Sequence, residues 1–217
     1  HIRYGNYYRQ VSTPSQLAAL SGTDANYEVW LTGDIDLTDY DWTAIDFRGK
    51  LYGEGYSVIG LTDSLFLTLY GTVENLTLED VNLVYTHDGT NVASFGALCR
   101  SINGGTVDGV NVYGTISSTG AVDVGAIAGA ISGGNVSITN SKNYASISGT
   151  GVSGSGSSGG ILGSTSSCKA LVFSGNGNYG TISGGLTGGL IGYSNLSYTI
   201  KDCYNYGAVS GTVYVGG

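Results

Sequence analysis

The sequence predicts an all-β protein, a right-handed parallel β-helix (β-solenoid) that begins with a short capping helix. Its 217 residues include 38 glycines, one proline and only 11% charged residues, less than half of the roughly 25% usual in soluble globular proteins. From residue 27 onward, short segments that alternate apolar and polar residues are separated by glycine-rich turns. Similar segments also recur at regular intervals, which is typical of stacked repeats.

The N-terminal residues predict an extension followed by a short helix. Residues 1–11 are rich in tyrosine, and we expect them to form an extension that could be donated as a strand to another molecule. Within residues 12–22, Thr13 and Gln16 have the spacing of a capping box, and Pro14 occupies the first helical position. A helix of about two turns is marginal alone. We therefore expect it to cover the first turn of a single solenoid domain that spans residues 12–217.

Residues 23–90 are predicted to form the first, acidic coils of this domain. Of the 16 acidic residues in the chain, 13 lie within residues 1–90. Several carboxylates lie close together and are candidate ligands for calcium, which prefers oxygen atoms; they are Asp34, Asp36, Asp39 and Asp41. The alternative is a solvated edge whose charges resist the addition of another strand.

A repeat shows how residues 91–217 are built. Four segments that begin with tyrosine start 31, 35 and 27 residues apart, at Tyr113, Tyr144, Tyr179 and Tyr206. The third residue after each tyrosine is apolar, and these residues are Ile116, Ile147, Ile182 and Val209. The sixth residue before it is also apolar, giving Val107, Ile138, Phe173 and Ile200. Alternation kept across copies is typical of parallel strands stacked turn upon turn, so these eight residues are the predicted core.

The same alignment predicts two ladders of side chains. Asparagine precedes the tyrosine in three of the copies, at Asn143, Asn178 and Asn205. Stacked asparagines in parallel, in-register β-structure can hydrogen-bond from amide to amide. The tyrosines should stack beside them along the same axis. Both ladders would hold the turns of the solenoid in register.

The repeated motifs resemble a known family. Gly-Gly-Ile-Leu-Gly at 159–163, Gly-Gly-Leu-Ile-Gly at 188–192 and Asn-Tyr-Gly-Thr-Ile-Ser-Gly at 178–184 are similar to the GLUG-motif repeat of secreted and surface-attached proteins. The resemblance covers residues 12–217 and implies a right-handed β-helix in an extracellular, adhesin-like or surface-structural setting. It transfers no catalytic residue.

The cysteines and the glycosylation sequons leave alternatives open. Cys99 falls in an apolar position of the glycine motif, so burial is expected. Cys168 and Cys203 do not share a repeat register, and a disulfide between them stays an open alternative. Three asparagines fit the sequon Asn-X-Ser/Thr and are candidate glycosylation sites; they are Asn75, Asn135 and Asn195.

The charge pattern and the composition limit the partners and the localisation that we expect. No basic stripe is available for phosphates, so neither nucleic acid nor an anionic membrane is an expected partner, and no apolar run is long enough for membrane insertion. A chain that begins at His1 and lacks methionine suggests a secreted form without its signal peptide.

Three functions are then considered. The first is a non-catalytic extracellular structural protein, not an enzyme, that assembles head to tail into a filament through its solenoid ends. The second is an adhesin that binds a glycan or a surface protein. The third is a polysaccharide-active enzyme using Asp34 and Asp36. No cofactor is expected apart from calcium.

Overall fold

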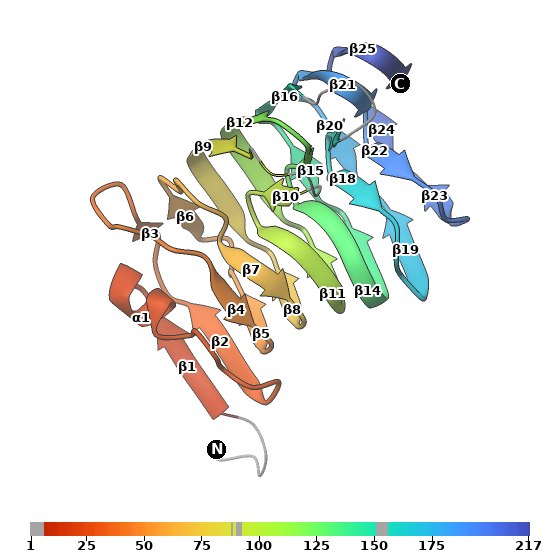
Figure 1. Ribbon diagram of the computed structural model, residues 1–217. Helices are drawn as coiled ribbons and strands as arrows, with labels where there is room; N and C mark the ends of the chain where they lie inside the picture. The colour runs from red at the N-terminus through yellow and green to blue at the C-terminus, as the bar shows by residue number, and fades with distance from the viewer. Residues whose placement is uncertain (1–6, 88, 90–92, 151–155) are drawn as a thin grey trace.

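The computed structural model describes residues 7–87, 89, 93–150 and 156–217 of the chain. Its strands form two curled sheets of 12 and 13 strands, and the chain advances from one end of the molecule to the other as it winds between them (Figure 1). Neighbouring strands in each sheet belong to successive turns and run parallel. The prediction of an all-β, parallel, β-helix-like fold is therefore confirmed.

The 12-stranded sheet contains eight strands along its main path and four that pair beside it. The main path is β1 (Tyr7–Val11), β2 (Tyr27–Leu31), β5 (Lys50–Tyr52), β8 (Thr72–Glu74), β11 (Cys99–Asp108), β14 (Ala128–Thr139), β18 (Leu162–Thr165) and β22 (Ile191–Ser194). The others are β4 (Ile45–Phe47), β7 (Phe66–Leu69), β19 (Ala170–Ser174) and β23 (Thr199–Lys201).

The 13-stranded sheet carries the repeated tyrosine segments. Its main path is β10 (Ala93–Gly96), β13 (Val122–Gly125), β17 (Ser157–Gly159), β21 (Ile182–Gly188), β16 (Ser146–Thr150), β12 (Asn111–Thr119), β15 (Lys142–Asn143), β20 (Gly177–Asn178) and β24 (Tyr204–Asn205). The others are β3 (Ile35–Asp36), β6 (Ser57–Ile59), β9 (Thr77–Thr86) and β25 (Val209–Gly216).

The N-terminal helix forms where its capping residues predict it. Helix α1 (Pro14–Ala18) starts after Thr13, whose hydroxyl accepts a hydrogen bond from the backbone N–H of Gln16. The side chain of Gln16 accepts one in return from the N–H of Ser12 at 2.9 Å. Leu17 is fully buried among the core residues. The described part of the N-terminal extension lies in the sheet of its own chain, because β1 pairs in parallel with β2. The described helix in this chain has neither the length nor the hydropathy of a membrane span.

Residues at one register in successive turns form a column. The apolar columns stack as the repeat alignment requires. Ile116 pairs with Ile147, Ile147 with Ile182, and Ile182 with Val209. The second column is also in register, running from Val107 through Ile138 and Phe173 to Ile200. All members are buried except the last of each column: Val209 is half-buried and Ile200 is exposed. The inward face of each turn is therefore continuous with the next.

The repeated glycine motif marks a place where strands approach one another closely. An ideal Cβ atom built on Gly129 would lie 2.0 Å from the backbone nitrogen of Phe95 and 2.6 Å from the carbonyl oxygen of Asp123. On Gly163 it would lie 2.4 Å from the oxygen of Gly129. Only glycine leaves room for backbones at this distance. These positions of the motif therefore require glycine.

The three cysteines are free thiols. Cys99 is buried, as expected, and burial raises the pKa of its thiol above the usual range. Cys168 and Cys203 are half-buried, and burial raises the pKa of both thiols. The structure thus leaves Cys168 and Cys203 unpaired, and the disulfide alternative is not realised in it.

Candidate functional site

The outer surface of the repeats carries a stack of tyrosines. Tyr113 and Tyr144 have ring centroids 4.5 Å apart, Tyr144 and Tyr179 4.9 Å, and Tyr179 and Tyr206 5.3 Å. The structure therefore contains the ladder that the repeat spacing predicts. All four side chains are exposed, so the ladder presents a line of ring edges and hydroxyl groups to solvent. Burial, together with the neighbouring Tyr144, raises the pKa of the Tyr113 hydroxyl.

A buried asparagine ladder holds the tyrosines in place. The side-chain amide of Asn143 donates to Oδ1 of Asn178 at 2.8 Å, and that of Asn178 donates to Oδ1 of Asn205 at 2.7 Å. Each amide also donates to the carbonyl oxygen two residues further along its own chain, which turns the backbone sharply after the tyrosine. Asn143 and Asn178 are completely buried. The backbone positions from which the tyrosines project are consequently fixed from inside.

Replacing Asn178 by alanine should lower the free energy of unfolding by about 2 kcal/mol, because it leaves buried partners in the turns above and below without a hydrogen bond. Urea unfolding followed by circular dichroism measures the change. Asn195→Ala is the matched control, because Asn195 is exposed, and we expect a change within about 0.5 kcal/mol. Equal losses for both variants would contradict the ladder's role.

Hydroxyl groups and glycines flank the tyrosine ladder. Outward positions in successive turns are occupied by Ser117, Ser148, Ser183 and Ser210, whose strands pair in register. A shallow hollow of about 450 Å³ lies over three turns here and is lined by residues 148–150, 183–185 and 210–212. We call this surface, made of the four ladder tyrosines and the adjacent serine column, the tyrosine face. Its chemistry is aromatic and hydrogen-bonding.

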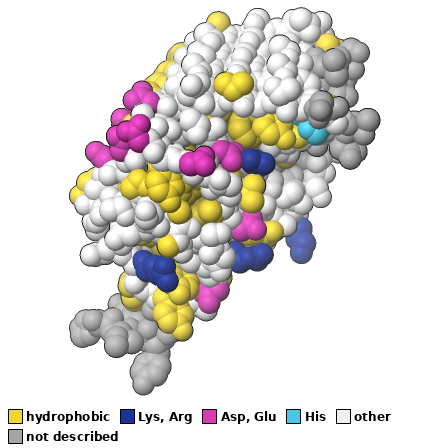
Figure 2. Space-filling model, turned by 60° about the vertical axis from the view of Figure 1, so that its left-hand side comes forward, with side chains coloured by type: hydrophobic (Ala, Val, Ile, Leu, Met, Phe, Trp, Pro, Cys, Tyr) yellow, Lys and Arg dark blue, Asp and Glu magenta, His cyan; other side chains and the backbone are white. Residues whose placement is uncertain are grey.

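Charge is distributed unevenly around the tyrosine face. Residues 91–217 contain three acidic and four basic residues, whereas the acidic side chains concentrate in residues 1–90. In Figure 2 the acidic side chains extend from the upper left edge of the visible face to its lower part, and the top of this face has few charged groups. Glu79 and Asp80 line a hollow together with Tyr113, so a partner would meet acidic groups beside the first ladder tyrosine. Along the later turns it would meet mainly rings and hydrogen-bonding groups.

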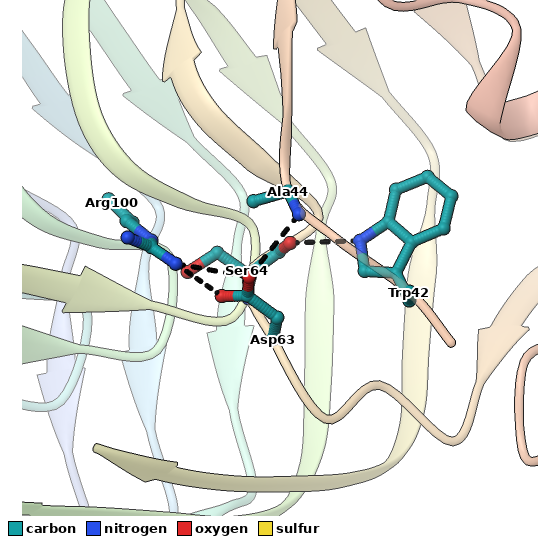
Figure 3. Close-up of polar contacts among 5 residues, drawn as sticks. All are labelled: Trp42, Ala44, Asp63, Ser64 and Arg100. Carbon is teal, nitrogen blue, oxygen red and sulfur yellow. Dashed lines mark hydrogen bonds and ion pairs between the residues drawn. The ribbon is translucent and has the colours of Figure 1, made fainter. Parts of the chain in front are cut away.

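A second polar cluster surrounds Asp63, and no sequence pattern predicts it (Figure 3). One guanidinium nitrogen of Arg100 lies 2.9 and 3.0 Å from the two carboxylate oxygens of Asp63. The same carboxylate accepts hydrogen bonds from the backbone N–H groups of Ala44 and Ser64. The indole N–H of Trp42 donates to the carbonyl oxygen of Ser64 at 3.0 Å. The cluster joins three consecutive turns, so we assign it a structural role.

Replacing Arg100 by alanine should lower the free energy of unfolding by about 1–2 kcal/mol. This change in the free energy of unfolding is smaller than the one expected for a fully buried ion pair, because the side chains of Arg100 and Asp63 are both partly exposed. Lys201→Ala is the control: Lys201 lies 3.8 Å from Asp202 in a pair that is largely exposed, and its removal should change stability by less than about 0.5 kcal/mol. Thermal unfolding of both variants tests the difference, and similar shifts would refute the structural role.

The structure does not bring the four candidate calcium ligands together. Asp34 accepts a hydrogen bond from the N–H of Ser57 at 2.8 Å. Asp36 accepts from the N–H and hydroxyl of Thr38, which lowers the pKa of its carboxyl group. Asp39 and Asp41 are exposed. Among the described residues, no three acidic, histidine or cysteine side chains form a group that could hold a metal ion.

The three sequon asparagines are all exposed, and one of them has a backbone role. Asn75 has φ of +52°, and the corners of later turns have the same left-handed conformation at Gly109, Asn140, Gly175 and Asp202. Asparagine, aspartate and glycine adopt this conformation more readily than other residues. This column of corners was not predicted, because its members share a conformation rather than one residue type.

No family model matches the sequence, and no curated protein matches it either. Two solved structures resemble the fold. One is the crystal structure of a proposed immunoglobulin A1 protease from Bacteroides ovatus, with TM-score 0.60 and 15% identity over 96% of this chain and 83% of that one. The other is named IgA1 protease, with TM-score 0.62 and 17% identity. It matches 99% of this chain, which spans only 21% of that protein.

These similarities correct one expectation. The repeats contain no acidic column, and on that basis the protein was expected not to be an enzyme. Both similar structures are named as IgA1 proteases, one of them as a proposal, and this points toward an enzyme rather than a non-enzyme. Because the absence of an acidic column concerns only one type of catalytic chemistry, it was too narrow a basis for that expectation. At 15% and 17% identity the likeness itself shows the fold alone.

Proposed function

We propose that this chain is an extracellular recognition module that binds a protein partner through the tyrosine face. In this proposal the module is a right-handed solenoid of the GLUG-repeat type, with α1 covering its first turn. The handedness is supported by the strong preference of parallel crossover connections for the right-handed form. The covering role of α1 is supported by Leu17 and Leu20, which are both fully buried.

The proposal rests on the residue composition of the tyrosine face and on the backbone beneath it, which the asparagine ladder holds in place. Antibody binding loops use tyrosine for large, rigid contact area, and serine, glycine and asparagine for adaptable hydrogen bonds. The tyrosine face has the same chemistry, with tyrosine rings 4.5 to 5.3 Å apart and serines beside them. Because the asparagine ladder holds these residues in place, little conformational entropy would be lost on binding.

The names of the structural neighbours suggest the partner. We propose that the module belongs to a longer protease-like protein and engages immunoglobulin A1 for it. The relative lengths of the two chains support this, since this chain corresponds to 21% of the longer protein named IgA1 protease. A substrate-binding module in such a protein would raise the local concentration of substrate near the catalytic part.

Biolayer interferometry of the 217-residue chain on immobilised human immunoglobulin A1 tests the proposal. We expect saturable binding that Tyr144→Ser and Tyr179→Ser together weaken at least tenfold, because aromatic anchors contribute most to such interfaces. Tyr56→Ser is the control, since Tyr56 is exposed but lies outside the tyrosine face. Gel analysis of the same mixtures reports any cleavage. Absence of binding, or equal binding by the double variant, would reject the proposal.

A further inference from the structure

The first two rings of the tyrosine ladder are the most closely aligned of the four. The rings of Tyr113 and Tyr144 are inclined by only 3°, with centroids 4.5 Å apart. The angle is 11° between Tyr144 and Tyr179, and 23° between Tyr179 and Tyr206. Because the first two rings project in the same direction from neighbouring strands, equivalent ring carbons lie opposite one another. These include the carbons next to the hydroxyl groups.

The backbone on both sides of this tyrosine pair is held in register. Before the tyrosines, Val112 pairs with Asn143, and the backbone N–H of Tyr144 donates to the carbonyl oxygen of Val112 at 2.8 Å. After them, Ile116 pairs with Ile147. The side chains of these four paired residues are all buried. The two rings therefore cannot move apart along the stack without opening the sheet beneath them.

Both tyrosine side chains can be reached by small reagents, since Tyr113 is 41% exposed and Tyr144 is 37% exposed. Burial, followed by the neighbouring Tyr144, raises the pKa of the Tyr113 hydroxyl. This influence of one side chain on the other indicates that the two hydroxyl groups lie close together. An ordinary tyrosine already has a pKa of about 10, so the Tyr113 hydroxyl is protonated at neutral pH. The pair therefore presents two neighbouring phenols to an oxidant.

We propose that Tyr113 and Tyr144 form a site of oxidative cross-linking, at which a haem peroxidase acting with hydrogen peroxide converts the pair to dityrosine. Each phenol loses one electron to the oxidant and one proton to water, which leaves a radical shared between the oxygen and the ring carbons next to it. A carbon–carbon bond then forms between the two rings, and the hydrogen on each joined carbon moves to the phenol oxygen of its own ring. Hydrogen peroxide takes up the two electrons and two protons and becomes two molecules of water.

The new bond would tie two consecutive turns together on the outer surface of the solenoid. Its ends are 31 residues apart in the chain, and a covalent bond that closes a loop of this length restricts the unfolded chain, as a disulfide does. The three cysteines are free thiols in the structure. The tyrosine pair would thus supply a covalent connection between turns that the cysteines do not. This cross-link is independent of binding to immunoglobulin A1.

Peptide mapping of the oxidised chain tests the proposal, because trypsin separates the two tyrosines. Cleavage after arginine and lysine releases peptides 101–142 and 143–169, which contain one tyrosine each. The dilute chain is treated with a haem peroxidase and hydrogen peroxide, and mass spectrometry then measures linked peptides that lack two hydrogen atoms. Peptide 51–100 is the internal control, since it carries Tyr56, which is 37% exposed, as Tyr144 is. We expect the link between the first two peptides to exceed links from the control peptide at least tenfold, because groups held in contact react far faster than groups that must meet by diffusion.

A variant with a displaced tyrosine shows whether the stacked geometry is responsible. Tyr144→Phe combined with Ser146→Tyr keeps one tyrosine in peptide 143–169 but moves it two residues along the outward face, where Ser146 is exposed and pairs with Thr115. This variant should give at least tenfold less of the linked product, and circular dichroism verifies that it folds. Consumption of free tyrosine in a parallel reaction shows that the oxidant is active. Absence of the linked product from the unmodified sequence, or an equal yield from the displaced variant, would overturn the proposal.

Discussion

Replacing Ile147 by aspartate is expected to lower the free energy of unfolding by about 4 kcal/mol or more, which would leave much of the protein unfolded at room temperature. Ile147 is 1% exposed and lies in register between Ile116 and Ile182. A carboxylate at this position would lose its hydration among apolar side chains, without a charged partner in the column. Urea unfolding, or the loss of soluble protein on expression, measures the effect.

The adjacent residue gives a matched control. Ser148 is exposed on the outward face of the same strand, and Ser148→Asp should change stability by no more than about 0.5 kcal/mol. Successive residues of a strand point to opposite faces, so the two substitutions test the direction of the strand as well as its burial. Comparable losses for Ile147→Asp and Ser148→Asp would show that the assigned faces are incorrect.

Gly129→Ala is expected to have the second-largest effect, a loss of more than about 3 kcal/mol. An added methyl group would lie 2.0 Å from the backbone nitrogen of Phe95. Because the neighbouring atoms belong to backbone rather than to flexible side chains, two strands would have to separate, and the effect should reach the upper end of those measured for overpacked cores. Thermal unfolding is the appropriate measurement.

Gly33→Ala is the control for this substitution. A Cβ atom on Gly33 would meet only Cβ of Ser12, at the ordinary distance of 3.8 Å. Removing a glycine where space and conformation allow it stabilises a protein slightly, by about 0.4–1 kcal/mol, through the unfolded state. If Gly129→Ala were tolerated as well as Gly33→Ala, the close approach at the glycine motif would not be the reason for its glycines.

The repeats allowed much of the fold to be predicted from the sequence. Columns such as Ile116–Ile147–Ile182 could be read because each turn repeats the same environment, so one alignment reports the burial of several residues at once. The asparagine and tyrosine ladders follow from the same argument. The N-terminal helix was visible because capping residues act locally, at Thr13 and Gln16, and do not depend on distant parts of the chain.

Features of the less regular turns could not be predicted. Asp63 and Arg100 are 37 residues apart, and neither belongs to a repeated pattern, so nothing in the sequence relates them. Residues 1–11 are predicted to be an extension whose strand could be donated to another molecule, yet the described part, Tyr7–Val11, pairs with β2 of its own chain. A repeat alignment cannot indicate this pairing, because the segment lies outside the repeats.

Functional residues were harder to recognise than core residues, for a physical reason. Core columns must be apolar in every turn, whereas an outward column only has to be compatible with solvent. The four aspartates from Asp34 to Asp41 are close in sequence, but their side chains serve local turns or face solvent. Proximity in sequence therefore suggested a calcium site that the described structure does not assemble.

Disulfide trapping between successive turns tests the in-register stack most directly, in a chain with Cys168 and Cys203 replaced by serine and the buried Cys99 retained. Ser117 and Ser148 are register partners on neighbouring strands, about 4.8 Å apart, within the range for a disulfide. We expect Ser117→Cys with Ser148→Cys to cross-link rapidly under mild oxidation, whereas Ser117→Cys with Thr150→Cys, two residues out of register, should not. Faster or equal cross-linking of the shifted pair would contradict the in-register stack.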